Sequence, residues 1–278
     1  MKPLVSIIIC THNRSLLLTR AIESVINQSY SNIEIIVSDD ASTDNTADIV
    51  KQFIINNPKI SIFYRCNDTN MGACFTRNQG IKLACGKFIT GLDDDDSFDV
   101  DRISKFVDYY DDKYSFFCSD IKVVGKNKSY NLFNGKNKVI TLCNALWYNC
   151  IGNQIFVERD RLMKVNGFDV NLTSAQDIDL WVRLIENYGV CYRLSENTYN
   201  LFIDHDSPRI TTSNNKLKGL INYFEKHSSK MTVSQRRFHL LRYEYWKNNK
   251  KFKLSFIKYL DLNILFLFLK IVFSKGIN

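Results

Sequence analysis

Four consecutive aspartates, Asp93 to Asp96, directly follow the apolar segment Phe88–Leu92. This pattern predicts a buried strand with carboxylates clustered at its C-terminal end. Four like charges in a row repel one another, and a divalent cation bound by carboxylate oxygens would relieve that repulsion. A solvated acidic loop is the alternative, because most charge runs lie in solvent. The rest of the chain decides between these two interpretations.

Short apolar runs alternate with helical patterns along the first hundred residues. Val5–Cys10, Ile33–Val37, Ile60–Tyr64 and Phe88–Leu92 are typical of strands buried on both faces. Helical patterns begin at Ser15 and cover 46–55, 73–85, 103–110, 159–165 and 177–187, with further strands at 116–119 and 155–157 and a polar loop or hairpin at 125–138. This repetition predicts an α/β fold with a mainly parallel sheet.

Polar side chains follow several of these strands at the point where each strand ends. Thr11, His12 and Arg14 follow the first strand, and Asp39 and Asp40 follow the second. Ligands of parallel sheets bind at the C-terminal ends of the strands. We therefore expect these side chains and the four aspartates to share one site.

Five motifs, in order, resemble family 2 glycosyltransferases of the GT-A fold. They are Thr11–Arg14, Ser38–Asp44, Leu92–Asp96, Gly167–Asp169 and Gln176–Trp181, and the resemblance covers roughly residues 4–212. It implies a mainly parallel sheet flanked by helices and a hexosyltransferase of the bacterial surface-polysaccharide type. It also implies inverting transfer of a sugar from a nucleotide-diphosphate donor, with Mn²⁺ or Mg²⁺ as cofactor.

The resemblance places the nucleotide beside the first two motifs. Thr11 would lie near the base and the phosphates, and His12 stands where the family often has a tyrosine that stacks on the base. Arg14 would either reach the phosphates or cap a turn. Asp39 and Asp40 fall where the family binds the base and the ribose, as carboxylates that accept from N–H and hydroxyl groups.

The resemblance also implies the metal site. Asp93 maps to ribose or metal contact, Asp95 to direct metal ligation and Asp94 to a supporting role, although a run of four leaves the register open by one residue. His205 would contact the metal or the diphosphate, and Arg77 would pair with the aspartates or the diphosphate. A cation that neutralises the diphosphate makes its departure easier.

Inversion needs a base that takes the proton of the acceptor hydroxyl. The family's Glu-Asp pair reads Gln176-Asp177 in this chain, so Asp177 is the expected base and the role of the glutamate is open. A carboxylate at a helix N-terminus is well placed to stay ionised. The alternative for Asp177 is a helix cap. Trp181, on the same helix, is expected in the core rather than in an acceptor platform.

The net charge of +8 belongs to the C-terminal tail. Residues 214–278 hold 14 Lys and Arg against 3 Asp and Glu, whereas residues 1–213 are slightly acidic. Aromatic and basic side chains are interleaved over 214–252, and the apolar block within 254–273 is too short to span a bilayer. These features predict a helical tail lying on an anionic membrane surface, with packing on the catalytic domain or in a dimer as the alternative.

The expected organisation is a catalytic domain at 1–213, with a nucleotide-binding half at 1–100 and an acceptor-binding half at 101–213, and the tail at 214–278. The N-terminus shows no signal-peptide pattern, and the eight scattered cysteines suit reduced thiols. We therefore expect a protein at the cytoplasmic face of the inner membrane. An acceptor on a lipid carrier would sit at that surface, so the expected acceptor is a lipid-linked oligosaccharide, as in O-antigen or capsule synthesis. The resemblance favours UDP as the nucleotide of the donor.

Two other function classes remain open from the residues alone. The basic aromatic tail would suit a nucleic-acid-binding protein, but the acidic character of residues 1–213 argues against a basic groove outside the tail. A glycoside hydrolase with paired carboxylates would need neither a metal nor a nucleotide, so resistance to a chelator would favour it.

Overall fold

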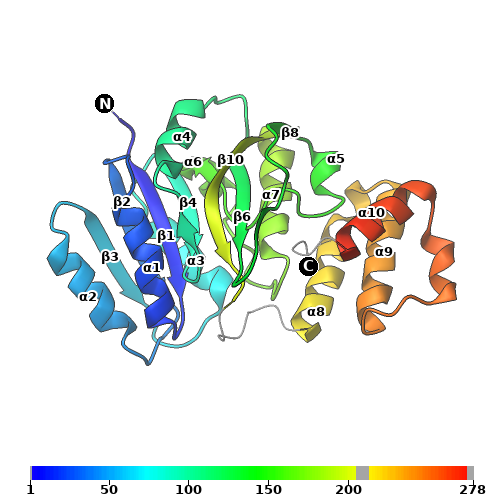
Figure 1. The fold of residues 1–278 in the computed structure, drawn as a ribbon, viewed down its shortest axis with the longest axis horizontal. Helices are drawn as coiled ribbons and strands as arrows, with labels where there is room; N and C mark the ends of the chain where they lie inside the picture. The colour runs from blue at the N-terminus through cyan, green and yellow to red at the C-terminus, as the bar shows by residue number, and fades with distance from the viewer. Residues whose placement is uncertain (1, 205–212, 274–278) are drawn as a thin grey trace.

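The computed structural model describes residues 2–204 and 213–273. A ten-stranded sheet has the order β3-β2-β1-β4-β9-β6-β10-β5, with β7 beside β6 and β8 beside β10. Helices cover the sheet, and the C-terminal helices form an extra layer at one end of the molecule (Figure 1).

The strands are β1 Val5–Thr11, β2 Ile33–Asp39, β3 Ser61–Cys66, β4 Phe88–Asp93, β5 Ser97–Phe98, β6 Phe117–Val124, β7 Ser129–Asn131, β8 Lys138–Ile140, β9 Phe156–Glu158 and β10 Cys191–Phe202. The helices are α1 Ser15–Ile26, α2 Thr46–Asn56, α3 Ala73–Leu83, α4 Arg102–Tyr109, α5 Leu142–Ala145, α6 Arg159–Lys164, α7 Gln176–Tyr188, α8 Ser213–His227, α9 Val233–Lys247 and α10 Leu262–Phe273. Two 3₁₀ turns, η1 Ser228–Lys230 and η2 Leu254–Tyr259, complete the elements.

The first four strands in the sheet order are parallel, and their register aligns the polar strand ends. Thr11 lies opposite Asp39 across β1 and β2, and Cys10 lies opposite Asp93 across β1 and β4. Alternate side chains of β1 face opposite sides of the sheet, so that Ile7 packs in one core and Ile8 in the other. The expected common edge of polar strand ends is therefore present.

The second half of the sheet joins the first through an antiparallel strand. β9 runs antiparallel to β4 and pairs with β6, which in turn runs parallel to β10. The α/β fold class expected from the sequence is confirmed, with short antiparallel strands added around the parallel ones. Within 125–138, where a loop or hairpin was expected, β7 pairs back on β6 as a hairpin.

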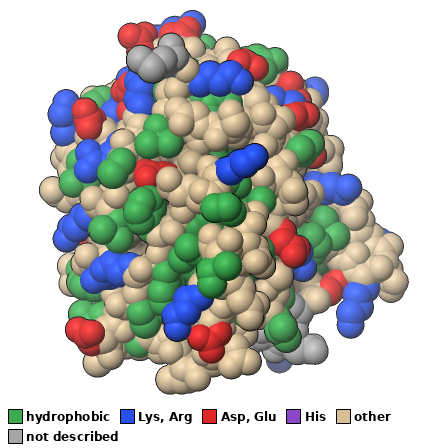
Figure 2. Space-filling view, turned by 90° about the vertical axis from the view of Figure 1, so that its left-hand side faces the viewer, with side chains coloured by type: hydrophobic (Ala, Val, Ile, Leu, Met, Phe, Trp, Pro, Cys, Tyr) green, Lys and Arg blue, Asp and Glu red, His purple; other side chains and the backbone are tan. Residues whose placement is uncertain are grey.

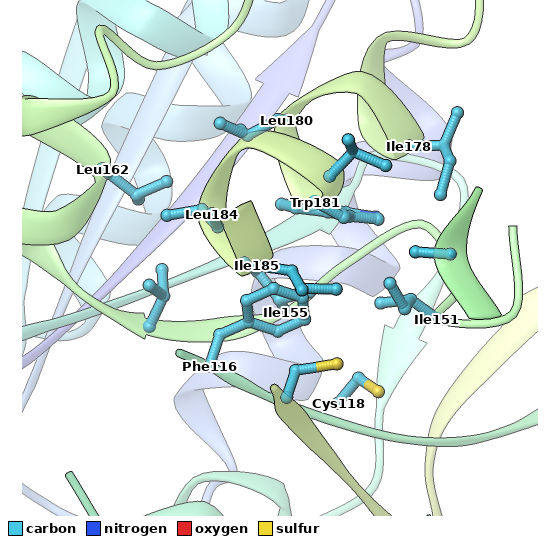
Figure 3. Close-up of a cluster of buried hydrophobic side chains, with 14 of the residues drawn as sticks. Phe116, Cys118, Ile151, Ile155, Leu162, Ile178, Leu180, Trp181, Leu184 and Ile185 are labelled. Atoms are coloured by element: carbon cyan, nitrogen blue, oxygen red, sulfur yellow. The ribbon is translucent and has the colours of Figure 1, made fainter. Parts of the chain in front are cut away.

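Helix α7 is anchored by a buried aromatic cluster. Trp181 and Ile185 lie close to Phe116 and Ile155 of the sheet side (Figure 3). The indole N–H of Trp181 donates to the carbonyl of Gly152 at 2.9 Å, and the residue is 2% exposed. Trp181 is therefore a core residue, and its packing fixes the helix that carries Asp177.

The C-terminal helices dock on the catalytic part of the chain. Tyr223 and Met231 belong to the same core cluster as α7. The Gln235 amide donates to the carbonyl of Cys143 at 2.9 Å, and a His239 ring nitrogen lies 2.8 Å from the carbonyl oxygen of Leu146. Packing on the catalytic domain, the alternative weighed for the tail, is therefore present. None of the helices in the described ranges is long and apolar enough to cross a membrane.

The opposite end of the molecule, which carries α2 and the edge strand β3, has a mixed surface. Hydrophobic side chains are exposed there among interspersed acidic and basic ones (Figure 2). Ile55 is 75% exposed and Phe63 is 50% exposed. Charges of both signs meet on this face, whereas the sequence concentrates unbalanced positive charge in the C-terminal helices.

Candidate active site

Burial alternates along the four aspartates, although β4 ends at Asp93 and the chain turns directly after it. The side chains of Asp93 and Asp95 are 23% and 16% exposed, whereas that of Asp94 is 6% exposed. Asp96 is buried. The run is therefore not a solvated loop: Asp93 and Asp95 remain partly accessible at the end of the sheet, and Asp94 and Asp96 point into the protein.

Asp94 ties the first motif to the aspartate run. Its carboxylate accepts from the Thr11 hydroxyl at 2.8 Å and from the Arg14 guanidinium at 3.0 Å. The same guanidinium nitrogen lies 3.3 Å from a carboxylate oxygen of Asp95. Burial raises the pKa of Asp94 to about 6, although Arg14 and Thr11 oppose the shift. The structure thus brings four of the expected donor-site residues together.

Asp96 has a structural position beneath the run. Its carboxylate accepts from the Tyr199 hydroxyl at 2.7 Å and from the Phe202 amide at 2.9 Å. Burial and the charges of Asp93 and Asp95 raise the pKa of Asp96 well above its usual value. Asp96 therefore fixes the end of β10 against the end of β4.

Asp93 lies in a ring of donors that reaches across to α7. It accepts from Arg77 at 3.2 Å, from Gln154 at 2.8 Å and from Asn153 at 2.7 Å. Arg77 also donates to the side-chain carbonyl of Gln176 at 3.1 Å. Sequence reasoning missed Asn153 and Gln154, whose only signal was their position just before the strand at 155–157.

Asp177 lies in the first turn of α7, next to Gln176, which Arg77 connects to Asp93 of the aspartate run. The preceding Ala175 has a left-handed backbone with φ of +58°, a strained conformation for a residue with a Cβ. Burial raises the pKa of Asp177 to about 7; the Arg77 charge lowers it and the Asp93 charge adds to the rise. None of the described residues donates a hydrogen bond to this carboxylate, so it is available to take a proton.

Gln176 fills the position of the family's glutamate with an amide. Its carbonyl oxygen accepts from Arg77 at 3.1 Å, and its NH₂ group donates to the carbonyl of Leu172 at 3.1 Å. A glutamate could accept from Arg77 but could not donate to Leu172 while ionised. The substitution therefore keeps the arginine contact and removes one negative charge beside Asp177.

Asp39 and Asp40 are both buried and both organise loops. Asp39 accepts from the Tyr64 hydroxyl at 2.6 Å. Asp40 accepts from the Met71 and Gly72 amides at 2.7 and 2.8 Å. Burial alone would raise the pKa of Asp40, but these and other hydrogen bonds bring it below its usual value. Each carboxylate thus holds together the rim of the expected nucleotide site.

His12 lies exposed on this rim. Its Nδ1 is 2.7 Å from the carbonyl oxygen of Asp40 and donates to it, because a carbonyl can only accept. Asn13 and Ala41, in the two adjoining loops, have left-handed φ values of +52° and +60°, strained backbone of the kind that gathers at functional sites. His205, the expected additional metal contact, lies outside the described residues.

The donor set at this edge suits a cation that shares its ligands with a substrate. No cluster of three or more His, Cys, Asp or Glu side chains able to hold a metal occurs within residues 2–204 and 213–273. An all-protein cage is therefore absent from the described chain. Mg²⁺ and similar hard cations are commonly held by one or two carboxylates together with substrate phosphates, and Asp95 and Asp93 can supply that share.

A small pocket of about 30 Å³ is lined by Arg77, Gln154 and Trp181 among others. Its volume suits roughly one water molecule. A nucleotide sugar is far too large for it. The aspartates and Arg14 lie instead at the edge formed by the strand ends.

The parallel strand ends, the aspartate run and the carboxylate on α7 define a nucleotide-sugar transferase of the GT-A fold. The family model for Glycosyl transferase family 2 matches residues 6–156. WcaA of Escherichia coli K12, a glycosyl transferase assigned to colanic acid biosynthesis, is 35% identical over 245 residues, covering 86% of each chain. The chain therefore belongs to glycosyl transferase family 2.

Two further comparisons extend the likeness. The Campylobacter jejuni GalNAc(5)-diNAcBac-PP-undecaprenol beta-1,3-glucosyltransferase is 27% identical over 80% of this chain and 72% of its own. The crystal structure of S. aureus TarS superposes with a TM-score of 0.67 at 20% identity, covering 95% of this chain. The chain spans half of TarS and 81% of its 1–349 fragment, which was solved with UDP-GlcNAc. At this identity TarS shows the fold alone.

Proposed function

We propose that this chain transfers a hexose or N-acetylhexosamine from a UDP-linked donor to a hydroxyl of a lipid-diphosphate-linked oligosaccharide, with inversion at the anomeric carbon. Family membership favours a transferase over the nucleic-acid-binding protein and the hydrolase. The solved TarS complex contains UDP-GlcNAc, and the Campylobacter relative is named for an acceptor on PP-undecaprenol. Both support the donor and acceptor classes.

One observation carries the proposal: a chain of contacts joins the aspartate run to the acid on α7. Arg77 contacts Asp93 on one side and Gln176 on the other, at 3.2 and 3.1 Å. Asp177 follows directly, with a pKa raised to about 7 by burial. A base of this pKa is half ionised at neutral pH, where proton transfer is most efficient.

In the proposed step, the acceptor hydroxyl gives its proton to the carboxylate of Asp177. The hydroxyl oxygen forms the new bond to the anomeric carbon, and the bond from that carbon to the diphosphate oxygen breaks, with its electron pair leaving on the nucleoside diphosphate. Attack and departure on opposite faces invert the configuration. The Arg77 guanidinium keeps Asp93 and the turn before Asp177 at a fixed separation.

Donor binding is proposed at the rim formed by the first two motifs. Thr11, Asp39 and Asp40 would surround the base and ribose, His12 would stack on the base, and Arg14 would approach the phosphates. Arg14 already contacts Asp94 and Asp95, so it lies beside the proposed cation position.

Asp95, with Asp93 and His205 as the other candidates, would hold Mn²⁺ or Mg²⁺, which when bound neutralises the departing diphosphate. Asp93 accepts from Arg77, Gln154 and Asn153, and Asp95 contacts Arg14, so each candidate carboxylate is already oriented by a neighbouring side chain.

We assign a separate binding role to each of the expected parts of the chain. Residues 1–100 would bind the nucleotide, residues 101–213 the acceptor, and the basic helices of 214–278 would bring the enzyme to the cytoplasmic face of the inner membrane. Lipid-linked acceptors reside at that surface. The product would extend a surface polysaccharide such as O-antigen or capsule.

A donor panel tests the proposal. The purified chain is given UDP-Glc, UDP-Gal, UDP-GlcNAc, UDP-GalNAc, GDP-Man or dTDP-Rha, a sugar-diphosphate-lipid acceptor and Mn²⁺, with and without EDTA. We expect transfer from one UDP-sugar, abolished by EDTA and by Asp95→Asn. Transfer that persists in EDTA would refute the metal role, and the absence of transfer and of UDP binding would refute the function.

A further inference from the structure

The C-terminal helices gather positive charge around one aromatic ring. The ammonium nitrogens of Lys216 and Lys250 lie 3.7 and 4.4 Å from the centre of the Trp246 ring. Because the two distances share the ring centre, the two nitrogens are at most about 8 Å apart. Arg242 lies one helical turn before Trp246 on α9. We call these three cations and the ring the Trp246 cluster.

The cations of the Trp246 cluster have no acidic partner among the described residues. Two other lysines of the same layer are neutralised: Lys226 lies 2.6 Å from Asp169, and Lys230 lies 2.5 Å from Glu186. Burial and the charges of Arg242 and Lys250 lower the pKa of Lys216 to about 8. Like charges held this close repel one another, and a bound anion would relieve that repulsion.

The backbone builds the cluster rather than leaving it to mobile side chains. Asn249 and Lys250 both have left-handed φ values, +50° and +61°. The Lys250 amide donates to the carbonyl of Tyr245 at 2.9 Å. This turn folds the chain back after α9, which brings the Lys250 ammonium over the indole. Each of these two non-glycine residues in the left-handed conformation costs on the order of 1 kcal/mol. The surrounding structure must therefore hold this turn, and with it the position of Lys250.

The cluster lies at the active-site end of the molecule. Helix α8, which carries Lys216 in its first turn, begins at the same end at which β10 finishes (Figure 1). The last residue of β10, Phe202, donates its amide to Asp96 of the aspartate run at 2.9 Å. An anion held by the cluster would therefore lie at the same end of the molecule as the aspartate run.

An apolar surface adjoins the cluster in the chain. Phe252, Leu254 and Ile257 are 49%, 84% and 57% exposed. The Phe252 ring lies 6.4 Å from that of the buried Phe268 on α10, so Phe252 is anchored to the last helix. Three unpaired cations beside exposed apolar side chains match a ligand with an anionic head and a hydrocarbon chain.

We propose that the Trp246 cluster binds the diphosphate of the lipid-linked acceptor, with the isoprenoid chain on the adjoining apolar surface of Phe252, Leu254 and Ile257. The inference rests on the proposed function, because it assigns a diphosphate carrier to the acceptor. Guanidinium and ammonium groups are the usual protein partners of phosphate oxygens. Binding there would hold the sugar end of the acceptor toward Asp177.

Binding of farnesyl diphosphate to the full chain, with the donor site filled by UDP, tests the site directly. Farnesyl monophosphate and farnesol serve as matched probes. We expect farnesyl diphosphate to bind most tightly, and Lys216→Gln combined with Lys250→Gln to weaken it roughly tenfold or more. Lys251→Gln, an exposed neighbour, removes the same type of charge outside the cluster and should leave binding unchanged.

The outcomes separate this site from its alternatives. Equal binding of farnesol and farnesyl diphosphate, or equal losses in the double variant and Lys251→Gln, would overturn the proposal. Binding to phosphatidylglycerol vesicles without binding to farnesyl diphosphate would assign the cluster to the membrane surface instead. UDP binding, measured by thermal shift in the same samples, tests the proposed function separately. Unchanged UDP affinity in the double variant confirms that it folds.

Discussion

At the scale of single residues, the proposed role of Asp177 as the base links the pH range of activity to the surroundings of its carboxyl. Burial holds the pKa of this carboxyl near 7, although Arg77 opposes the shift and Asp93 reinforces it. A base must be ionised before it accepts a proton. The position of the acidic limb of the activity profile therefore reports on this carboxyl.

We expect kcat/KM to fall about tenfold per pH unit below a pKa close to 7 and to level off above it. Activity falls toward low pH because a protonated Asp177 cannot accept the proton of the acceptor hydroxyl. Initial rates across the range from about pH 5 to about pH 9, at fixed free metal concentration, measure the limb. An acidic limb near the ordinary aspartate value would show that Asp177 is not the group that titrates.

Gln176→Glu tests how charge beside the base is controlled. The new carboxylate would face Arg77, 3.1 Å away in the native contact, and would add a negative charge beside Asp177. Like charge raises the pKa of an acid, so the acidic limb should move up by roughly half a pH unit or more. Gln52→Glu, on the exposed face of α2, adds the same charge away from the site and should leave the limb in place.

Asp177→Asn should stabilise the fold at neutral pH. A carboxyl with a raised folded-state pKa is most favourable when protonated, so its contribution is lost as the pH rises from about 4 to about 7. The amide cannot ionise and should raise the free energy of unfolding by about 1 kcal/mol or more at pH 8. Thermal melts at pH 5 and pH 8 check this, and a variant less stable than wild type at pH 8 would contradict the buried environment.

At the scale of elements, α7 is positioned from two sides. Trp181 packs it on the sheet, and α8 holds it from outside through a buried carboxylate. Asp179 accepts from Arg183 at 2.9 Å, lies 2.8 Å from the ammonium of Lys226, and pairs with the ring of His227 at 2.8 Å. The helix that carries Asp177 is therefore fixed partly by α8.

Asp179→Asn should destabilise the protein by about 2 kcal/mol at pH 7. Burial would raise the pKa of Asp179, but its hydrogen bonds to His227 and Lys226 lower it to about 2. The stabilisation is present above the unfolded pKa and is lost as the pH falls from about 4 to about 2. Urea unfolding at pH 7 and at pH 3 measures the difference. Asp160→Asn, whose side chain is 81% exposed, is the matched control. Equal changes in the free energy of unfolding for Asp179→Asn and Asp160→Asn would show that Asp179 does not hold α7 to α8.

The elements also show where sequence reasoning succeeds and fails. The strand ends at Thr11, Asp39 and Asp93 could be predicted, because apolar runs that end in polar groups are local patterns. The contact of Gln154 with Asp93 spans 61 residues and that of His227 with Asp179 spans 48. Such long-range partners leave no periodic signal, so Asn153 and Gln154 beside Asp93 and the tether on α7 were not foreseen, whereas the pairing of Arg77 with the aspartates was expected from the resemblance.

At the scale of the whole molecule, the tail belongs structurally to the catalytic part. Tyr223 and Met231 lie in the core that contains Trp181, whereas Phe238 and Phe268 form a separate small cluster farther out. Helix α8 and the turn after it therefore complete the core around α7, in the same part of the chain that carries the excess of positive charge.

A chain that ends at residue 213 should lose solubility or melt at a clearly lower temperature than the full chain. Removal of the tail would expose the core that Tyr223 and Met231 cover. It would also remove both tail partners of Asp179. A chain that ends at residue 261, which removes only α10, should be affected less. The melting temperatures of the full chain and of the chains that end at residues 261 and 213 test this prediction. An unchanged melting temperature for the chain that ends at residue 213 would contradict the shared core.

The most direct measurement compares sugar transfer and donor binding in wild type and Asp177→Asn. With the UDP-sugar chosen by the donor panel, we expect the variant to bind the donor with wild-type affinity and to transfer at least about a hundredfold more slowly. The wild-type product should have inverted anomeric configuration by NMR. Full activity in Asp177→Asn, or a retained configuration, would contradict the assignment of Asp177 as the base.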